Sequence, residues 1–231
     1  MTTATEETTR VERLREAQGL ARELFAAIEQ TGVIRAGVGE RAASDAIKDL
    51  AADLLGVERH WHKRVIRAGS NALFPYAANP PERVIEADDI VYADLGPIFG
   101  AWEADFGRTY VLGDDPDKHR LRDTLPIVFD AGCAHFDATP DITGEQLFAF
   151  MVAEGERHGW EWGGTIAGHL VGEFPHGLAE GDGDFSRIMP GNNRPMRGLD
   201  AVGKVCHWIL EVHLVDRQRE IGGFYEELLD F

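Results

Sequence analysis

Several acidic and histidine residues lie in apolar segments or beside glycine, where an uncompensated charge is costly. They are Asp94, Asp105, His169, Glu211 and one of Glu226 and Glu227. Four carboxylates and one imidazole suit two adjacent divalent metal ions such as Mn²⁺, Co²⁺, Fe²⁺ or Zn²⁺, which accept oxygen and nitrogen donors. A water between two such ions becomes a hydroxide nucleophile near neutral pH. The set therefore predicts a metal-dependent hydrolase.

Each of these residues also has an ordinary structural explanation. Asp94 and Asp105 could cap turns, a common role of aspartate, and Glu211 could pair with an arginine. His60 and His62 alternate in the segment HWHK, which would place both on one face of a strand. A paired metal site there is one option, but we interpret them as surface histidines at the start of a strand.

Two apolar stretches carry the two aspartates. The segments 91–96 (VYADLG) and 102–111 (WEADFGRTYV) are rich in β-forming residues. Gly96, Pro97 and Gly100 punctuate the chain between them. We expect two neighbouring strands, each with one aspartate at its core.

The rest of the chain predicts a single domain over residues 9–231, preceded by a disordered polar lead at 1–8. Apolar residues at helical spacing predict helices over 9–32 and about 40–55. Further helices are expected over about 116–135 and, after a capping box of Thr143 and Gln146, over 144–158. Strands are expected at 64–69, 205–215 and 220–231, and loops at 70–82 and 178–204.

Composition narrows the class of protein. The 231 residues carry a formal net charge of −17, which disfavours nucleic acid and anionic membranes as partners. The N-terminal segment has no apolar signal-peptide core, and no apolar run approaches the length of a membrane span. The two cysteines have no metal-ligand spacing. We expect a cytoplasmic protein whose partner is a small peptide or small molecule, with a homodimer left open.

The order of these motifs resembles the pita-bread metallopeptidases, the family of methionine aminopeptidases, aminopeptidase P, prolidases and creatinases. Asp94 in ADLG and Asp105 in ADFGRT are eleven positions apart, and His169 and His176 in GHLVGEFPH are seven apart, as in that family. A glutamate in WILEVH and another in GFYEEL complete the order. The sequence around residues 66–111 is most similar to that of the Xaa-Pro peptidase branch.

This resemblance implies an α+β pita-bread fold, in which a twisted antiparallel sheet with outer helices forms two pseudo-symmetric halves around a central dinuclear metal site. The implied ligands are Asp94, Asp105, His169, Glu211 and Glu226. Asp94 would hold only one ion, Asp105 and Glu226 would bridge both, and His169 and Glu211 would hold the other. Choosing Glu226 over Glu227 follows from strand alternation, which directs only one of them inward.

The resemblance also implies catalytic and substrate-binding roles. Glu211 would shuttle a proton of the bridging water, and His176 would contact the substrate carbonyl, although a histidine after Pro175 could be an ordinary loop residue. The family has a further histidine about eighteen positions before the first aspartate. Counting eighteen positions back from Asp94 places Tyr76 there, and matching the local sequence motif places Pro75 there. We assign Tyr76 to substrate binding, since tyrosine is a poor base at neutral pH.

Three functions remain open. We expect an aminopeptidase or dipeptidase of Xaa-Pro type, with manganese among the candidate metals. The alternative is a creatinase-like hydrolase of a small non-peptide C–N bond, which Tyr76 favours. The third is a non-catalytic binding module, which loss of metal ligands would indicate.

Overall fold

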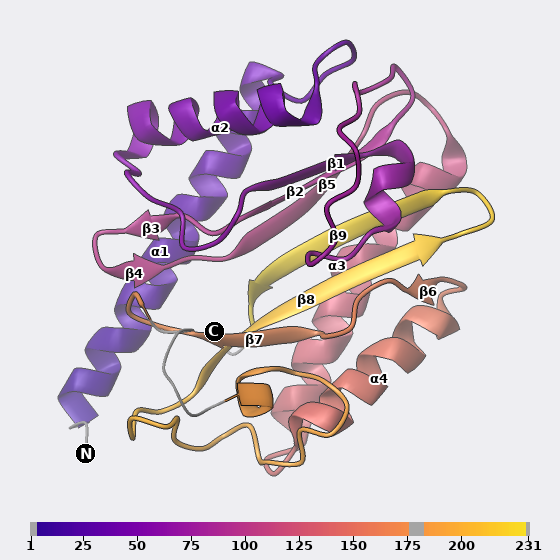
Figure 1. Cartoon of the computed structure of the whole chain (residues 1–231). Helices are drawn as coiled ribbons and strands as arrows, with labels where there is room; N and C mark the ends of the chain where they lie inside the picture. The colour runs from indigo at the N-terminus through magenta and orange to yellow at the C-terminus, as the bar shows by residue number, and fades with distance from the viewer. Residues whose placement is uncertain (1–3, 176–182, 230–231) are drawn as a thin grey trace.

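The fold is taken from a computed structural model that describes residues 4–175 and 183–229. A seven-stranded antiparallel sheet has the order β1-β2-β5-β9-β8-β6, and β7 also pairs with β8 (Figure 1). The strands are β1 (Val65–Ala68), β2 (Ile90–Leu95), β5 (Phe106–Val111), β6 (Glu161–Trp162), β7 (Gly168–Val171), β8 (His207–Asp216) and β9 (Ile221–Leu228). A small hairpin of β3 (Ile98–Phe99) and β4 (Trp102–Glu103) separates β2 from β5.

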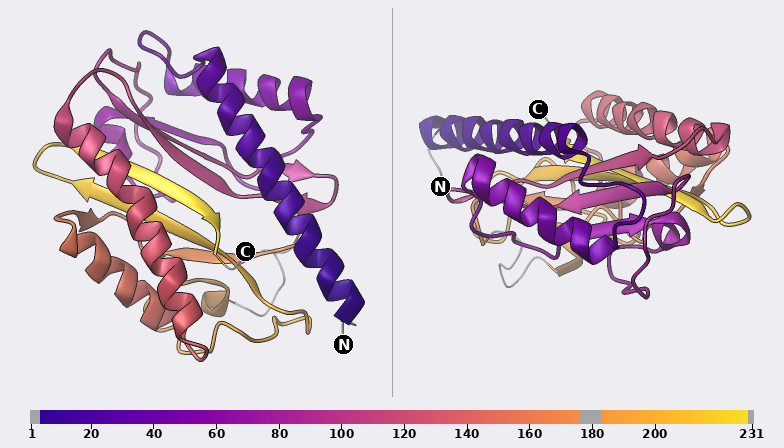
Figure 2. Two further views of the ribbon diagram at one scale, coloured as in Figure 1. Left: turned by 180° about the vertical axis from the view of Figure 1, so that it is seen from behind. Right: turned by 90° about the horizontal axis from the view of Figure 1, so that it is seen from above.

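Four described helices pack on the sheet as two pairs, α1 (Ala4–Thr31) with α2 (Glu40–Leu55) and α3 (Pro116–Ala138) with α4 (Gly144–Arg157). Seen from behind, α1 and α3 cross the strands side by side (Figure 2). The first pair shares one apolar core with β1, β2 and the start of β5, and the second pair shares another with β7, β8 and β9. The sheet is therefore covered by helices in two halves, as expected.

Strand alternation decides which residues face the helices. In β8, Leu210, Val212 and Leu214 are fully buried in the core beneath α3 and α4. The alternate residues Glu211 and His213 therefore point to the opposite face. Each large apolar side chain buried in this way contributes roughly 1.5–3 kcal/mol to folding. The helix-side core thus fixes the register that places acidic residues on the other face.

Most of the expected elements are present. Helix α2 has the bounds expected for it, and α4 begins with the predicted capping box, in which the Thr143 hydroxyl accepts from the Gln146 N–H. The expected loop at 70–82 begins within a 3-10 helix, η1 (Gly69–Leu73). The described part of the long loop, from residue 183 on, holds only the short 3-10 helix η2 (Gly183–Ser186) before β8.

The prediction of a disordered polar segment at the N-terminus is wrong for residues 4–8, which form the start of α1. The physical reason is a tertiary contact. Glu7 accepts from Arg10 at 2.6 Å and lies 2.6 Å from Nε2 of His207, while Arg10 also donates to the Val205 carbonyl at 3.2 Å. None of the helices in the described part of the chain has the length and apolarity that a membrane span requires.

Candidate metal centre

A row of paired residues crosses four strands on the face opposite the helices. Asp94 in β2 is paired with Gly107 in β5, Gly107 with Glu226 in β9, and Glu226 with Glu211 in β8. A Cβ atom on Gly107 would lie 3.1 Å from Cβ of Glu226 and 2.5 Å from the Phe224 ring. The glycine therefore leaves space between carboxylates that come from both halves of the sheet.

Asp105, directly before β5, lies at the centre of the polar groups. Its Oδ1 atom is 3.0 Å from Nε2 of His62, and its Oδ2 atom is 3.1 Å from Nε2 of His169. His62 Nε2 is also 3.5 Å from Asp94, and His169 Nε2 is 3.7 Å from Glu211. Asp105 thus lies between two histidines, each of which also approaches another carboxylate.

Glu226 and Glu227 point to opposite faces of β9. Glu226 is 2% exposed, and its Oε2 atom has no hydrogen-bond partner within the described ranges. Glu227 is instead paired with Arg108 and, at 2.9 Å, with Arg22 of α1. Because Glu227 is neutralised on the helix side, Glu226 is the member of the pair that faces Asp105, and it forms a group of potential ligands with Asp105 and His169.

Crowding of buried carboxylates raises the pKa of several of them. Burial, followed by the charge of Asp105, raises the pKa of Asp94 to about 7, and burial raises the pKa of Glu211 to about 7 as well. Burial and the charges of Asp105, Asp94 and Glu211 raise the pKa of Glu226 well above its usual value. A divalent cation would convert this repulsion into attraction.

The two histidines experience the opposite effect. Burial alone would lower the pKa of each imidazole, but Asp105 and a second carboxylate outweigh it and raise the pKa of His62 and of His169 to about 9. Burial would likewise raise the pKa of Asp105, yet the two histidines hold it well below its usual value. Asp105 is therefore the carboxylate of the cluster that stays ionised.

The structure brings together Asp94, Asp105, His169, Glu211 and Glu226, all five of the expected ligands. It also brings in His62, which we interpreted as a surface residue. That interpretation is wrong, because the His62 side chain is 7% exposed and lies outside any strand. The signal available in the sequence was the position of HWH just before the strand that pairs with Asp94. The described metal-ligand groups contain His62 but not His60, so the two do not form a paired site.

The two expected substrate-binding residues have different outcomes. Tyr76 is 45% exposed, with its ring centroid 5.6 Å from that of His62 and the Lys63 ammonium 4.5 Å from its ring centroid. Pro75, the other residue considered at this position, accepts a hydrogen bond from Arg67 through its carbonyl. His176 lies outside the described residues.

The donor atoms of the buried cluster around Asp105 suit the expected metal ions. Carboxylate oxygens and imidazole nitrogens are the donors that Mn²⁺, Co²⁺, Fe²⁺ and Zn²⁺ share. The unpartnered Oε2 atom of Glu226 would otherwise be a costly orphan in a buried position. We therefore take this cluster as the candidate dinuclear centre.

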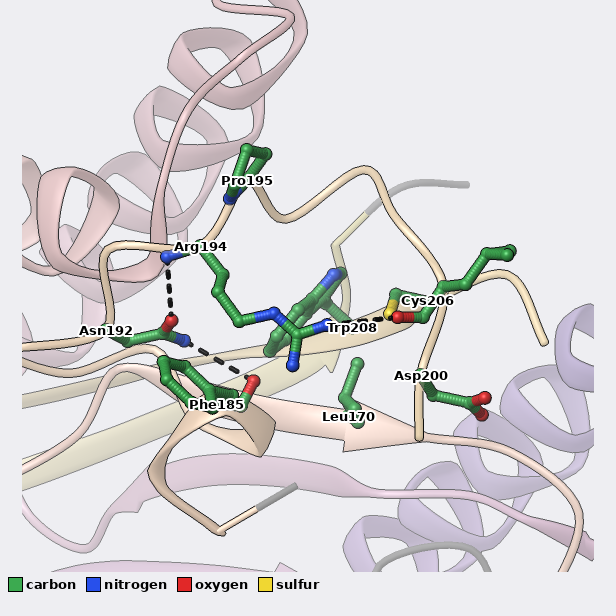
Figure 3. A pocket seen from close by; sticks show the side chains of 9 residues that line it. Leu170, Phe185, Asn192, Arg194, Pro195, Asp200, Cys206 and Trp208 are labelled. Carbon is green, nitrogen blue, oxygen red and sulfur yellow. Dashed lines mark hydrogen bonds between the residues drawn. The ribbon is translucent and has the colours of Figure 1, made fainter. Parts of the chain in front are cut away.

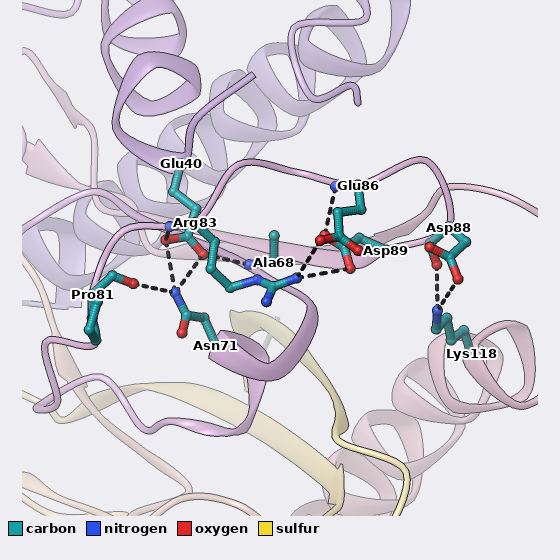
Figure 4. Close-up of polar contacts among 9 residues, drawn as sticks. All are labelled: Glu40, Ala68, Asn71, Pro81, Arg83, Glu86, Asp88, Asp89 and Lys118. Atoms are coloured by element: carbon teal, nitrogen blue, oxygen red, sulfur yellow. Dashed lines mark hydrogen bonds and ion pairs between the residues drawn. The ribbon is translucent and has the colours of Figure 1, made fainter. Parts of the chain in front are cut away.

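Two other features do not match this chemistry. Glu86, Asp88 and Asp89 form a second acidic group, but Arg83 and Lys118 pair with it (Figure 4). A pocket beside Trp208 has a volume of only about 10 Å³ and is lined by residues such as Asn192 and Arg194 of the long loop (Figure 3). Neither has the buried, unpaired donors of the central cluster.

Comparison with known proteins gives a consistent assignment. The model of metallopeptidase family M24 matches residues 12–199. A protein named Xaa-Pro dipeptidase from Pyrococcus furiosus is 29% identical over 125 residues, covering 54% of this chain and 34% of that protein. A second Xaa-Pro dipeptidase, from Pyrococcus horikoshii, is 28% identical over 158 residues, covering 66% of this chain and 42% of that protein. The chain thus spans less than half the length of these relatives.

Solved structures show the same fold. A prolidase from Thermococcus sibiricus superposes with a TM-score of 0.74 at 17% identity, over 96% of this chain and 56% of that one. A methionine aminopeptidase from Rickettsia prowazekii superposes with a TM-score of 0.67 at 15% identity, over 96% of this chain and 92% of that one. The fold expected from the sequence, the α+β pita-bread fold, is confirmed.

Proposed function

The chain belongs to metallopeptidase family M24, and from this premise we propose that it is a dinuclear metal-dependent hydrolase of Xaa-Pro peptides. The observation that carries the proposal is the buried cluster around Asp105, in which carboxylates from β2, β8 and β9 converge and Glu226 has an unpartnered oxygen. The names of the relatives support Xaa-Pro substrates.

In this proposal the five expected ligands would hold two divalent ions. When bound, the ions would supply a hydroxide near neutral pH and polarise the scissile carbonyl. Asp105 and Glu226 lie between the two halves and would be shared by both ions. Glu211, which faces the row from β8, would take the proton released by the nucleophile and return it to the leaving amine.

Tyr76 supports a second candidate. Burial raises the pKa of the Tyr76 phenol, so this group donates a hydrogen bond but does not act as a base at neutral pH. Because no base stands at this position, we propose creatinase-like hydrolysis of a small non-peptide C–N bond as the alternative. A binding module without catalysis is the weaker proposal, because all five expected ligands converge.

The test is a reconstitution assay. The protein is stripped with a chelator, reloaded with Mn²⁺, Co²⁺, Fe²⁺ or Zn²⁺, and assayed for release of proline from Xaa-Pro dipeptides and of the first residue from Xaa-Pro tripeptides. Metal-dependent release, with matched Xaa-Ala peptides turned over more slowly, supports the proposal. Two bound ions per chain with no peptide turnover would instead favour the C–N hydrolase. Absence of metal binding would overturn both.

A further inference from the structure

His62 and His169 approach Asp105 in closely matched ways. Nε2 of His62 is 3.0 Å from one oxygen of the carboxylate, and Nε2 of His169 is 3.1 Å from the other. In each imidazole, Nδ1 lies 2.7 Å from the backbone carbonyl of the next residue, Lys63 or Leu170. A neutral ring therefore keeps its proton on Nδ1, and its Nε2 lone pair is free for a metal ion.

We infer that His62 is a nitrogen ligand of the metal ion held by Asp94, so that each ion of the centre has one histidine. This inference rests on the proposed dinuclear function. His62, Asp94 and Asp105 each offer a ligand atom within 4.8 Å of the others. His62 Nε2 lies 3.0 Å from Asp105 and 3.5 Å from Asp94. Donors that share one ion at about 2.1 Å lie roughly 3.0–3.4 Å apart.

The chain holds the His62 ring in this position. A Cβ atom on Gly96 would lie 2.2 Å from Cδ2 and 2.4 Å from Nε2 of His62, so the ring occupies space that only glycine leaves. The backbone N–H of Trp61 donates to the Gly96 carbonyl at 2.9 Å, and its indole N–H donates to Ala104 at 3.1 Å. The segment is therefore fixed to the turn that follows Asp94.

Trp61 also links the two histidines. Its ring makes edge contacts with His62 and His169, at centroid distances of 4.5 Å and 5.3 Å. Contacts of this kind restrict the rotation of both imidazoles, and an oriented histidine binds a metal ion more tightly than a free one. Trp61 acts here as a positioning residue.

The extra nitrogen changes which metal the centre should select. An ion held only by carboxylates and water suits Mn²⁺, whereas imidazole suits Zn²⁺ and Fe²⁺. With His62 on one ion and His169 on the other, both positions should prefer Zn²⁺ or Fe²⁺ to Mn²⁺. The alternative to this inference is that His62 is a protonated partner of Asp105 and does not bind metal.

The first measurement compares metal binding by the full chain and by His62→Gln. Equilibrium dialysis of the stripped proteins against Co²⁺, with metal analysis, gives the number of ions and their affinities. We expect two ions in the wild type, and in His62→Gln one ion of unchanged affinity and a second bound about 10- to 100-fold more weakly. His60→Gln is the matched control and should bind as the wild type does.

A second measurement follows metal binding in the wild type itself. The wild type is labelled with ¹⁵N in its histidine rings and titrated with Zn²⁺, and the ring nitrogens are followed by NMR. The His62 and His169 signals, assigned from His62→Gln and His169→Gln, should both take the Nε2 shift of a zinc-bound imidazole. A shift confined to His169 while two ions bind would overturn this inference and leave the proposed function standing. Failure of the wild type to bind metal would overturn both.

Discussion

Two buried sites in this protein surround their carboxylates in opposite ways. Glu40, the first residue of α2, is 8% exposed, and its carboxylate accepts hydrogen bonds from three N–H-bearing residues. The donors are the backbone of Ala68 at 2.8 Å, the Asn71 amide at 3.0 Å and the backbone of Arg83 at 3.1 Å (Figure 4). This carboxylate is satisfied by the protein and ties α2 to the segment after β1.

The central cluster is as deeply buried, but Glu226 at its centre has no comparable set of donors among the described residues. Glu226 is 2% exposed, one of its oxygens has no partner among the described residues, and its neighbours Asp94, Asp105 and Glu211 are also acids. Burial alone therefore does not mark a functional carboxylate. A lack of hydrogen-bond donors marks it instead, because an acid surrounded by acids is stable only with a cation or a proton.

The largest expected effect is on the central cluster. Glu226→Gln keeps the shape of the side chain but removes a shared anionic ligand. We expect one or both metal ions to be lost and kcat/KM on an Xaa-Pro peptide to fall by at least ~10³-fold, since metal ions stabilise the transition state by several kcal/mol. Metal analysis and steady-state kinetics on the reloaded variant measure both effects.

Glu227→Gln is the matched control, one residue away on the other face of β9. Its carboxylate pairs with Arg22 and Arg108, so the variant should bind metal normally. Its free energy of unfolding should fall by only about 1–2 kcal/mol, because a charged hydrogen-bonded pair is weakened. If Glu227→Gln lost metal and Glu226→Gln did not, the assignment of faces in β9 would be wrong.

The second prediction is the opposite result at Glu40, a loss of stability without a loss of metal. Glu40→Ala leaves the buried N–H groups of Ala68, Asn71 and Arg83 without their acceptor. We expect the free energy of unfolding to fall by about 2–4 kcal/mol, as urea denaturation would measure. Metal stoichiometry and kcat of the remaining folded protein should stay unchanged. Loss of metal from this variant would contradict the separation of the two groups.

The sequence predicted the elements and most of the centre because local signals and strand alternation agree. Glu226 and Glu227 were separable in principle by the two-residue period of a strand, and the structure places them as that period requires. The capping box of Thr143 and Gln146 is equally local, since both hydrogen bonds form within one helical turn.

What the sequence did not predict depends on distant contacts. His62 contacts Asp105, 43 positions away, and its burial depends on the space left by Gly96. Glu7 contacts His207, 200 positions away, and this pair helps to extend α1 into the expected polar lead. Neither residue has a local pattern that distinguishes it from a surface residue, so periodicity could not find them.

The smallest predicted effect is a pH dependence that arises mainly in the central cluster. In the metal-free protein, the pKa values of Asp94 and Glu211 are about 7 and those of His62 and His169 are about 9. All four are higher than in an unfolded chain, so between about pH 4 and 9 these groups bind more protons in the folded state than in the unfolded state. Burial lowers the pKa of His60 and of His213 to about 4, which opposes this effect below about pH 6.5. We therefore expect the stability to fall with rising pH most clearly above about pH 6.5.

We expect the Tm of the metal-free protein to decrease by roughly 5–10 °C between pH 5 and pH 8, as differential scanning calorimetry would measure. Asp94→Asn should reduce this decrease, because it removes one of the groups whose pKa is raised. Saturating Zn²⁺ should reverse the trend, since the ion competes with protons for the same donors and binds more tightly at higher pH. A Tm that rose between pH 7 and pH 8 in the metal-free protein would contradict the raised pKa values of the central cluster.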